Sequence, residues 1–248
     1  MYKNERQDEI IKILSRDGYA TVENLSNLLY TSPSSIRRDL IALEKQGLVR
    51  RSYGGVEPVK SNSRAVPFSM RVQRRIAEKK CMAQKAAQLV RDKDIIFLDQ
   101  SSSALFLAQE LADRKITIVT NNVEILSSIY SQNQITIYSS GGALSHDRGS
   151  LLGDDACAAF EKFHADFAFF SSKALSFDGV IYDASLSEVL VKEAMLRNAS
   201  RKVFLCDSEK FDTFSGYKQR ALSEVDVLIS EDDSAQRFAR MFPGLEVL

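Results

Sequence analysis

Six short apolar runs that alternate with helical segments constrain the fold of this 248-residue chain more than any other feature. Strands of a parallel sheet covered on both faces are continuously apolar, because both of their faces are buried. We expect such strands at residues 95–98, 116–119, 135–138, 167–170, 203–206 and 227–229. We expect helices at residues 103–112, 123–131, 154–163, 186–199 and 235–241. This alternation predicts an α/β domain with a doubly wound, mostly parallel sheet.

The first 57 residues predict a smaller domain made of three helices and a two-stranded ribbon. Thr21 is a suitable N-cap for the second helix, and Ser32 for the third. Pro33 suits the first position of the third helix, where a missing N–H group costs no hydrogen bond. Glycines 54 and 55 predict the turn of the ribbon. A polar, aperiodic segment at 58–67 is interpreted as a linker, so the α/β domain occupies residues 68–248.

Basic residues concentrate around the third predicted helix and the linker. Residues 31–80 hold 12 Lys and Arg against four Asp and Glu, although the net charge of the whole chain is zero. This uneven distribution favours a polyanionic partner at one end, although a solvated charged surface would give the same excess. A single helix is expected at 68–90. We interpret its basic part, 71–80, as an interdomain or solvated helix, with a second DNA contact as the alternative.

The third helix has the pattern of a helix that reads DNA. Ile36, Leu40 and Leu43 recur at helical spacing, which leaves small polar and basic side chains on the opposite face. Such side chains near a helix N-terminus can contact base edges and phosphates in the major groove. The two-stranded ribbon after this helix can reach the DNA backbone beside the groove. The expected DNA contacts are Ser32, Ser34, Ser35, Arg37, Arg38, Arg50, Arg51 and Tyr53. Asp39 is acidic and cannot favour binding to DNA, so it is expected to pair with a neighbouring arginine. For Arg38, an ion pair within the protein is the alternative to a DNA contact.

Polar residues follow the first two predicted strands of the α/β domain. Ligands of doubly wound sheets bind beyond the carboxyl ends of strands, and helix N-termini there favour phosphate. The segment Asp99–Ser103 and the pair Thr120-Asn121 stand at such places. Serines at these positions also act as simple N-caps, so both interpretations remain open. Glu188 and Lys192 lie four residues apart on a helix and are interpreted as an ion pair.

Longer motifs resemble the DeoR family of bacterial regulators. In the first half they are Arg6, Ile10, Leu14, Gly18, Val22, Leu25, Ser32, Ile36-Arg37-Arg38-Asp39-Leu40, Leu43, Gly47, Leu48, Arg50 and Gly54-Gly55. In the second half they are Glu78-Lys79, Asp99–Ser103, Thr120-Asn121, Gly141-Gly142, Gly153 and Asp207–Phe211. The resemblance implies a winged helix-turn-helix over residues 1–57. Over residues 75–232 it implies a sensor domain similar to sugar-phosphate isomerases and CoA transferases. Pro33 and Tyr53 depart from the family pattern, the latter replacing a common histidine.

The resemblance implies a phosphorylated sugar or a related intermediate as effector. The residues implied to bind it are Asp99, Ser101, Ser102, Ser103, Thr120, Asn121, Gly141, Gly142 and Lys210. Where the family has a glycine-containing turn after residues 167–170, this chain has Ser171-Ser172-Lys173. Lys173 is therefore a further candidate, which either contacts an anion or blocks part of the pocket.

These features predict a cytoplasmic DNA-binding regulator that represses an operon for sugar or carbohydrate metabolism. It would bind double-stranded operator DNA as a homo-oligomer, a dimer or tetramer, and be released by a phosphorylated sugar. The alternatives are a sugar-phosphate isomerase-like enzyme with an accessory DNA-binding domain and a non-specific nucleic-acid binder. We expect no enzymatic activity, because no spacing marks a general base. The three cysteines and two histidines lack metal-ligand spacing, and no apolar run reaches membrane-helix length, so no metal, cofactor or membrane partner is expected.

Overall fold

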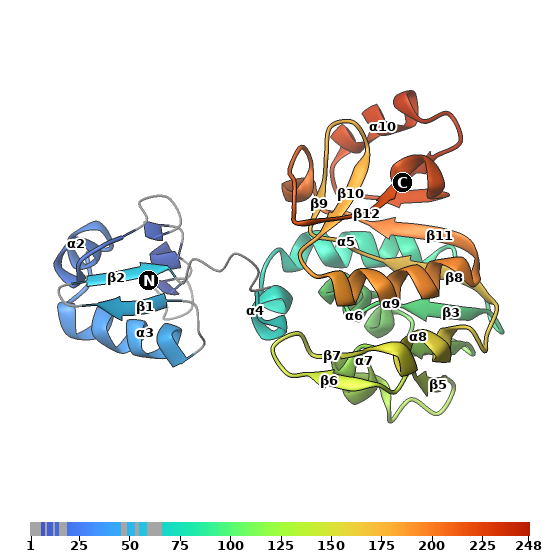
Figure 1. The fold of residues 1–248 in the computed structure, drawn as a ribbon, viewed down its shortest axis with the longest axis horizontal. Coiled ribbons are helices and arrows are strands. Elements are labelled where there is room, and N and C mark those ends of the chain that lie inside the picture. Colours follow the sequence, from blue (N-terminus) through green and yellow to red (C-terminus); the bar gives the residue numbers. More distant parts are fainter. Residues whose placement is uncertain are drawn as a thin grey trace. The chain divides into compact units, whose positions relative to one another are not determined.

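The structure of the protein, a computed structural model, describes residues 6–7, 9–11, 13–14, 19–45, 49–52, 55–58 and 66–248 (Figure 1). The chain divides into two units, residues 1–62 and 63–248, and each has its own buried core. Tyr53 and residues 59–65 of the expected linker lie outside the described residues, as does the side chain of Arg50.

The first unit is built around two helices, α2 (Val22–Leu28) and α3 (Pro33–Lys45). Leu25 of α2 packs with Ile36 and Leu40 of α3 in a buried apolar cluster, as the helical spacing predicted. The predicted cap of α2 forms, because the Thr21 hydroxyl accepts a hydrogen bond of 3.0 Å from the backbone N–H of Asn24. The apolar stripe of α3 is therefore buried, and its opposite face is left to solvent.

A two-stranded antiparallel ribbon follows α3, formed by β1 (Val49–Ser52) and β2 (Gly55–Pro58). Val56 of β2 also exchanges two backbone hydrogen bonds with Ala20, of 2.8 and 2.9 Å, so the ribbon is anchored to the segment that leads into α2. Helix, turn, helix and ribbon together form a winged helix-turn-helix, which confirms the predicted architecture of the first unit.

Within residues 66–248, a seven-stranded sheet has the order β14-β13-β11-β8-β3-β4-β5, and all its neighbouring strands are parallel. Its strands are β3 (Ile95–Leu98), β4 (Thr117–Thr120), β5 (Thr136–Ser139), β8 (Ala165–Phe170), β11 (Ala199–Leu205), β13 (Val227–Ile229) and β14 (Glu246–Val247). From β3 the chain first adds β4 and β5 on one side and later adds β8 and β11 on the other. The order thus reverses between β3 and β8, where doubly wound sheets bind their ligands.

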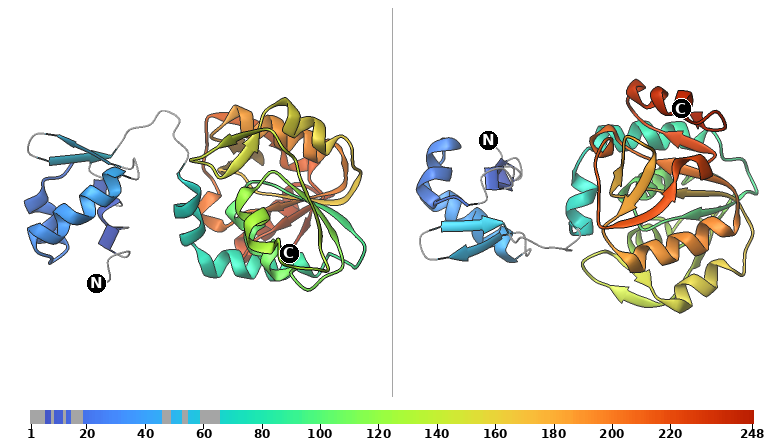
Figure 2. Two further views of the ribbon diagram at one scale, coloured as in Figure 1. Left: turned by 90° about the horizontal axis from the view of Figure 1, so that it is seen from below. Right: turned by 45° about the horizontal axis from the view of Figure 1, so that its top comes forward.

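Helices cover both faces of this sheet (Figure 2), which confirms the doubly wound fold. Ile96 and Leu98 of β3 belong to one buried cluster, whereas Phe97 between them belongs to the cluster on the opposite face. This double burial explains why the strand is continuously apolar. The covering helices are α5 (Ile76–Ala87), α6 (Ser102–Glu110), α7 (Val123–Ile129), α8 (Asp154–Phe160), α9 (Leu186–Arg197) and α10 (Gln236–Met241). Among the described residues, no helix combines the length and apolar character needed to cross a membrane.

The expected helix over 68–90 is in fact two helices, α4 (Phe68–Gln73) and α5. The chain turns between them at Arg74 and Arg75, and Arg75 has a left-handed backbone with a φ of 51°. The Arg75 guanidinium is held by ion pairs to Glu231 (2.7 Å) and Asp207 (3.6 Å). These carboxylates, which are distant in sequence, stabilise a turn that has neither glycine nor proline.

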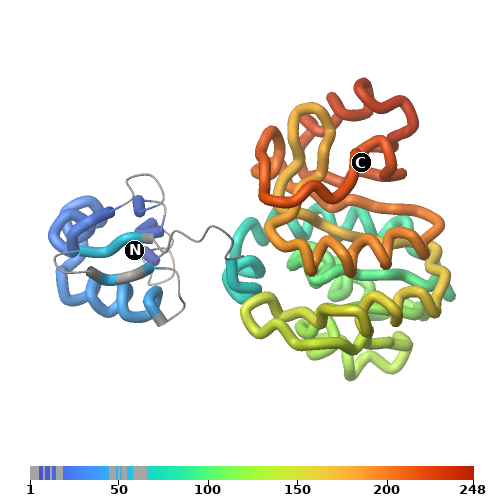
Figure 3. The backbone as a smooth tube through the Cα atoms, viewed as in Figure 1, coloured from blue at the N-terminus to red at the C-terminus, as the bar shows by residue number. Residues whose placement is uncertain are grey.

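Short antiparallel strands were not predicted and complete the second unit (Figure 1), and Figure 3 traces the path of the backbone through it. Strands β9 (Ala174–Leu175), β10 (Val180–Asp183) and β12 (Tyr217–Ala221) form a small sheet in the order β12-β10-β9. A hairpin of β6 (Ala143–Ser145) and β7 (Ser150–Leu152) precedes α8. The small sheet positions Asp183, which ends β10 beside the carboxyl ends of β8 and β11.

Candidate DNA-binding face and ligand pocket

The predicted DNA contacts on α3 lie opposite its buried stripe. Ile36 and Leu40 are buried, whereas Ser34, Arg37 and Arg38 are exposed. Arg37 makes no hydrogen bond or ion pair with any described residue. Its guanidinium is therefore free to meet a ligand without breaking an existing interaction.

Three serines cluster at the start of α3. The Ser32 hydroxyl lies 3.1 Å from those of Ser34 and Ser35, and it accepts the backbone N–H of Ser35 at 3.4 Å. Arg38 donates to the Ser35 hydroxyl at 3.3 Å and forms no ion pair with a described residue, so the alternative intramolecular pair is not observed. The N-terminal turn of α3 thus presents hydroxyls and two arginines on one exposed surface.

Asp39 is buried within α3, with 1% of its surface exposed. Arg6 donates to its carboxylate at 2.6 Å, which agrees with the expectation that Asp39 pairs with an arginine. The partner comes from the first residues of the chain rather than from the neighbouring Arg37 or Arg38. Asp39 therefore ties the N-terminal segment to α3 and keeps its negative charge away from the exposed face.

Arg51 links the ribbon to α3. Its Nε lies 2.7 Å from Oε2 of Glu44, and both side chains are partly exposed. An exposed ion pair of this kind contributes roughly 0–1 kcal/mol, so it can be exchanged for a contact with DNA. Arg51 is consequently held beside α3 but is less available than Arg37.

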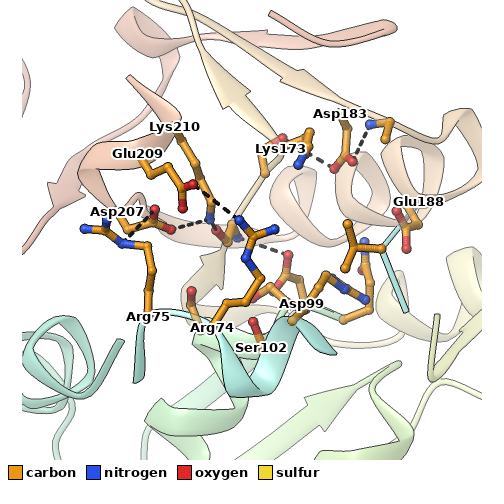
Figure 4. A pocket seen from close by; sticks show the side chains of 18 of the residues that line it. Arg74, Arg75, Asp99, Ser102, Lys173, Asp183, Glu188, Asp207, Glu209 and Lys210 are labelled. Atoms are coloured by element: carbon orange, nitrogen blue, oxygen red, sulfur yellow. Dashed lines mark hydrogen bonds and ion pairs between the residues drawn. The ribbon is translucent and has the colours of Figure 1, made fainter. Parts of the chain in front are cut away.

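In the second unit, a cavity of about 390 Å³ opens at the carboxyl ends of β3, β8 and β11, where the strand order reverses (Figure 4). The loops after these strands supply Asp99–Ser103, Ser171–Lys173 and, from Asp207 onward, Glu209 and Lys210. The remaining lining residues are Val66, Arg71, Arg74, Arg75, Lys79, Asp183, Ala184, Glu188, Lys192, Thr213 and Phe214. The predicted candidates Asp99, Ser101, Ser102, Ser103, Lys173 and Lys210 thus all line one cavity.

Asp99 is fully buried and joins two of these loops. Its carboxylate accepts the backbone N–H groups of Ser101 and Ser171, each at 3.0 Å. Burial raises the pKa of Asp99, and nearby Lys192 opposes that rise. Ser101 caps α6 by accepting the N–H of Ala104 at 3.0 Å. Ser101 therefore acts as an N-cap, whereas the hydroxyl of Ser102 bonds to no described residue and stays a candidate for ligand binding.

Positive charge exceeds negative charge on the cavity wall. Among the described lining residues, seven side chains are basic and five are acidic. The basic residues are Arg71, Arg74, Arg75, Lys79, Lys173, Lys192 and Lys210. This excess, beside the free N–H groups of the first turn of α6, favours an anionic ligand.

Lys210 belongs to the cavity rather than to the outer surface. Its ammonium lies 2.8 Å from the Ser171 hydroxyl and 3.0 Å from a carboxylate oxygen of Asp207. Burial alone would raise the pKa of Asp207, but Lys210 and Arg75 lower it below its usual value. Asp207 therefore stays ionised and holds Lys210 in place.

Two other lysines of the wall are electrostatically perturbed. Lys79 is buried and donates to the backbone oxygens of Arg71 and Arg74, so it fastens the turn between α4 and α5. Burial, reinforced by Lys210, lowers the pKa of Lys79 to about 8. Partial desolvation and the charge of Lys210 also lower the pKa of Lys173, which stands at the exposed edge of the cavity.

The other four predicted effector residues do not line the cavity. Thr120 donates to the Leu98 carbonyl at 2.7 Å, and Asn121 donates to the side-chain oxygen of Gln100 at 3.3 Å, so both support the loop after β3. Gly141 and Gly142 have positive φ values of 65° and 100°. A Cβ atom at Gly142 would lie 2.5 Å from the Leu152 carbonyl oxygen, so a residue with a side chain would clash with the backbone there.

Sequence reasoning missed the arginines of the α4–α5 region. Of the segment 71–80, interpreted as an interdomain or solvated helix, Arg71, Arg75 and Lys79 are partly or fully buried in the cavity wall, whereas Arg74 lines the cavity with an exposed side chain. The turn between α4 and α5 brings them there. The dense basic run itself was the signal that could have identified them.

The expected ion pair between Glu188 and Lys192 does not form. Lys192, 1% exposed, pairs instead with Asp183 and donates to the Ser171 carbonyl at 2.8 Å. Glu188 pairs with Arg148 at 2.8 Å. Burial alone would raise the pKa of Asp183, but the Lys192 ammonium lowers it. The described residues hold no group of three or more His, Cys, Asp or Glu placed to bind a metal.

Two solved structures show a distant likeness to this chain. Ribose 5-phosphate isomerase A from Methanocaldococcus jannaschii has a TM-score of 0.40 and 17% identity, covering 54% of this chain and 53% of that chain. The eIF2B delta subunit from Chaetomium thermophilum has a TM-score of 0.47 and 14% identity, covering 66% and 61%. Structural similarity this weak does not indicate what this chain does.

Family and sequence comparisons are specific. Residues 6–62 match the DeoR-like helix-turn-helix domain, and residues 74–232 match the DeoR C-terminal sensor domain. The HTH-type transcriptional regulator GolR of Listeria innocua is 31% identical, over 94% of this chain and 92% of its own length. The lactose phosphotransferase system repressor of Staphylococcus aureus is 28% identical over the full length of both chains. These relatives are named as regulators, which favours a regulator over an isomerase-like enzyme. With both domain models matched, the chain belongs to the DeoR family of transcriptional regulators.

Proposed function

We propose that the protein represses an operon for sugar or carbohydrate metabolism and that a phosphorylated sugar bound in the cavity relieves the repression. The observation that carries this proposal is the basic cavity at the reversal point of the sheet, on the same chain as an exposed basic helix α3. The names of two relatives support the repressor role, the lactose phosphotransferase system repressor and the HTH-type transcriptional repressor GlcR of Bacillus subtilis.

The phosphate would lie between the first turn of α6 and the lysines of the opposite wall. Backbone N–H groups at a helix N-terminus bind phosphate, and a lysine adds a mobile point charge. Ser102, Lys210 and Lys173 supply the hydroxyl and the two ammonium groups at this place. The ion pair of Lys210 with Asp207 keeps the ammonium positioned before the ligand arrives.

DNA recognition would use α3 in the major groove and the ribbon beside it, in a dimer or tetramer of the chain. Two copies of the winged helix then bind half-sites separated by whole helical turns. The effector can release DNA only to the extent that it binds one arrangement of the copies more tightly than the other.

Replacement of Lys210 by alanine is expected to leave DNA binding intact and to remove the response to the effector. A hydrogen bond to a charged group is strong enough that its loss should weaken sugar-phosphate binding about tenfold or more. The test is a thermal-shift screen of pentose and hexose phosphates, because a ligand of the folded state raises the melting temperature. Lys218→Ala, an exposed lysine of β12 outside the cavity, is the control and should respond like the unmodified chain. A full response in Lys210→Ala would remove Lys210 from the phosphate site.

A further inference from the structure

The cavity has two chemically different ends. Figure 4 shows Lys210 with Asp207 and Glu209 on one side of the view and Asp183 with Glu188 on the other, with Asp99 and Ser102 between them. The first end combines the ammonium groups of Lys210 and Lys173 with the N-terminus of α6. The second end has a carboxylate from the first turn of α9, Glu188, which is 5% exposed.

One oxygen of this carboxylate has no hydrogen-bond partner in the part of the chain that the structure describes. Oε2 of Glu188 forms the ion pair with Arg148, but Oε1 is buried and accepts no hydrogen bond from the described residues. Arg71 lines the same cavity, and its Nε is likewise buried without a hydrogen-bond partner. Buried polar atoms are normally paired, so these two atoms are candidates to bond a group that enters the cavity.

The charges at this end determine which chemical group fits. Burial, and then the nearby Asp183, raise the pKa of Glu188, while Arg148 and Arg71 oppose that rise. Lys192 and Arg148 already pair with these two carboxylates, so Oε1 of Glu188 needs a hydrogen-bond donor there rather than a further charge. An ionised carboxylate only accepts hydrogen bonds, and a phosphate dianion does too, whereas a hydroxyl can donate one. Oε1 of Glu188 therefore suits a neutral donor and not the phosphate itself.

We propose that Oε1 of Glu188 accepts a hydrogen bond from a hydroxyl group of the effector. Glu188 thereby sets the direction in which the effector lies, with its phosphate toward Lys210 and its hydroxyl-bearing end toward α9. It also makes the cavity selective for polyhydroxylated phosphates over simple phosphate. This inference rests on the proposed function and assigns a specificity-determining residue to its site.

The experiment compares the unmodified chain with Glu188→Gln by isothermal titration calorimetry. The probes are inorganic phosphate, the sugar phosphate with the largest thermal shift in the screen, and the deoxy analogues of that sugar phosphate. Glu188→Gln should weaken the sugar phosphate about tenfold. It should leave inorganic phosphate unchanged, and it should leave unchanged the deoxy analogue that lacks the bonded hydroxyl. Glu193→Gln is the matched control, because Glu193 lies on the same helix and pairs with Arg220 outside the cavity.

Three results would overturn the inference. Equal sugar-phosphate affinity in Glu188→Gln and the unmodified chain would leave the proposed function standing and place a water molecule, not the effector, at Oε1. An equal loss for inorganic phosphate would show that Glu188 only supports the cavity wall. Binding of no sugar phosphate by the unmodified chain would overturn both proposals together. If Glu188→Gln melts well below Glu193→Gln, Glu188→Asp replaces it, since this change keeps the charge and withdraws the oxygen by one methylene.

Discussion

Replacement of Lys192 by methionine is expected to lower the free energy of unfolding by about 3–5 kcal/mol. Lys192 is almost fully buried and pairs with Asp183, and its charge also acts on Asp99 and Glu188. Methionine fills a similar volume but leaves the Asp183 carboxylate buried without its ion-pair partner. Removing one partner of a buried pair is costly for this reason, whatever the pair itself contributes.

The dependence of this loss on pH has a definite sign. In the unmodified chain the pKa of Asp183 is lowered, so its contribution to stability is present above its unfolded pKa of about 4 and is lost as pH falls further. Without Lys192, burial dominates and raises that pKa, so ionised Asp183 destabilises the fold near neutral pH. The loss should therefore be larger at pH 7.5 than at pH 5, where the carboxylate takes up a proton.

Chemical denaturation followed by circular dichroism measures both effects. Lys218→Met is the control, because Lys218 is exposed and should tolerate the same change within about 0.5 kcal/mol. A Lys192→Met chain as stable as this control at neutral pH would show that the buried pair does not hold β10 and α9 together.

Replacement of Arg37 by alanine is expected to weaken operator binding by about 1–3 kcal/mol. Arg37 is exposed on α3 and has no partner among the described residues, so its removal costs no internal contact. Arg51, by contrast, would have to give up its ion pair with Glu44 to contact DNA. The free energy of unfolding should stay unchanged in Arg37→Ala, which separates a loss of recognition from a loss of fold.

Fluorescence anisotropy on a duplex selected from a random pool measures this loss, at one fixed salt concentration. A base contact would relax sequence preference at one position, whereas a phosphate contact would weaken all sequences alike and reduce the salt slope by about one. Arg197→Ala, an exposed change in the sensor unit, should bind as the unmodified chain does. Unaltered DNA affinity in Arg37→Ala would contradict the assignment of α3.

The sheet could be predicted because its strands are buried on both faces. Phe97 and its neighbours Ile96 and Leu98 pack into opposite clusters, and this makes the run apolar without interruption. The turn between α4 and α5 could not be predicted. Arg75 adopts its left-handed conformation because Asp207 and Glu231, more than 130 residues away in sequence, hold its guanidinium.

The cavity was predictable where strand ends converge. The loops after β3 and β11 carried Asp99–Ser103 and Lys210, and the parallel sheet brings both to one edge. Thr120 ends β4 and Asn121 follows it, and β4 lies on the other side of β3 from β8, so these residues bond to Leu98 and Gln100 and do not line the cavity. Spacing along α9 suggested a local ion pair for Lys192, but a carboxylate from the unpredicted strand β10 lies closer.

On this account, a ligand of the cavity controls the affinity of the chain for DNA. The most direct test titrates the sugar phosphate identified by thermal shift into the complex of the full chain with its operator duplex, followed by anisotropy. The duplex should be released with a midpoint that tracks the affinity of the sensor cavity, and Lys210→Ala should hold the duplex throughout. Undiminished DNA binding at ligand concentrations that saturate the cavity would contradict the claim.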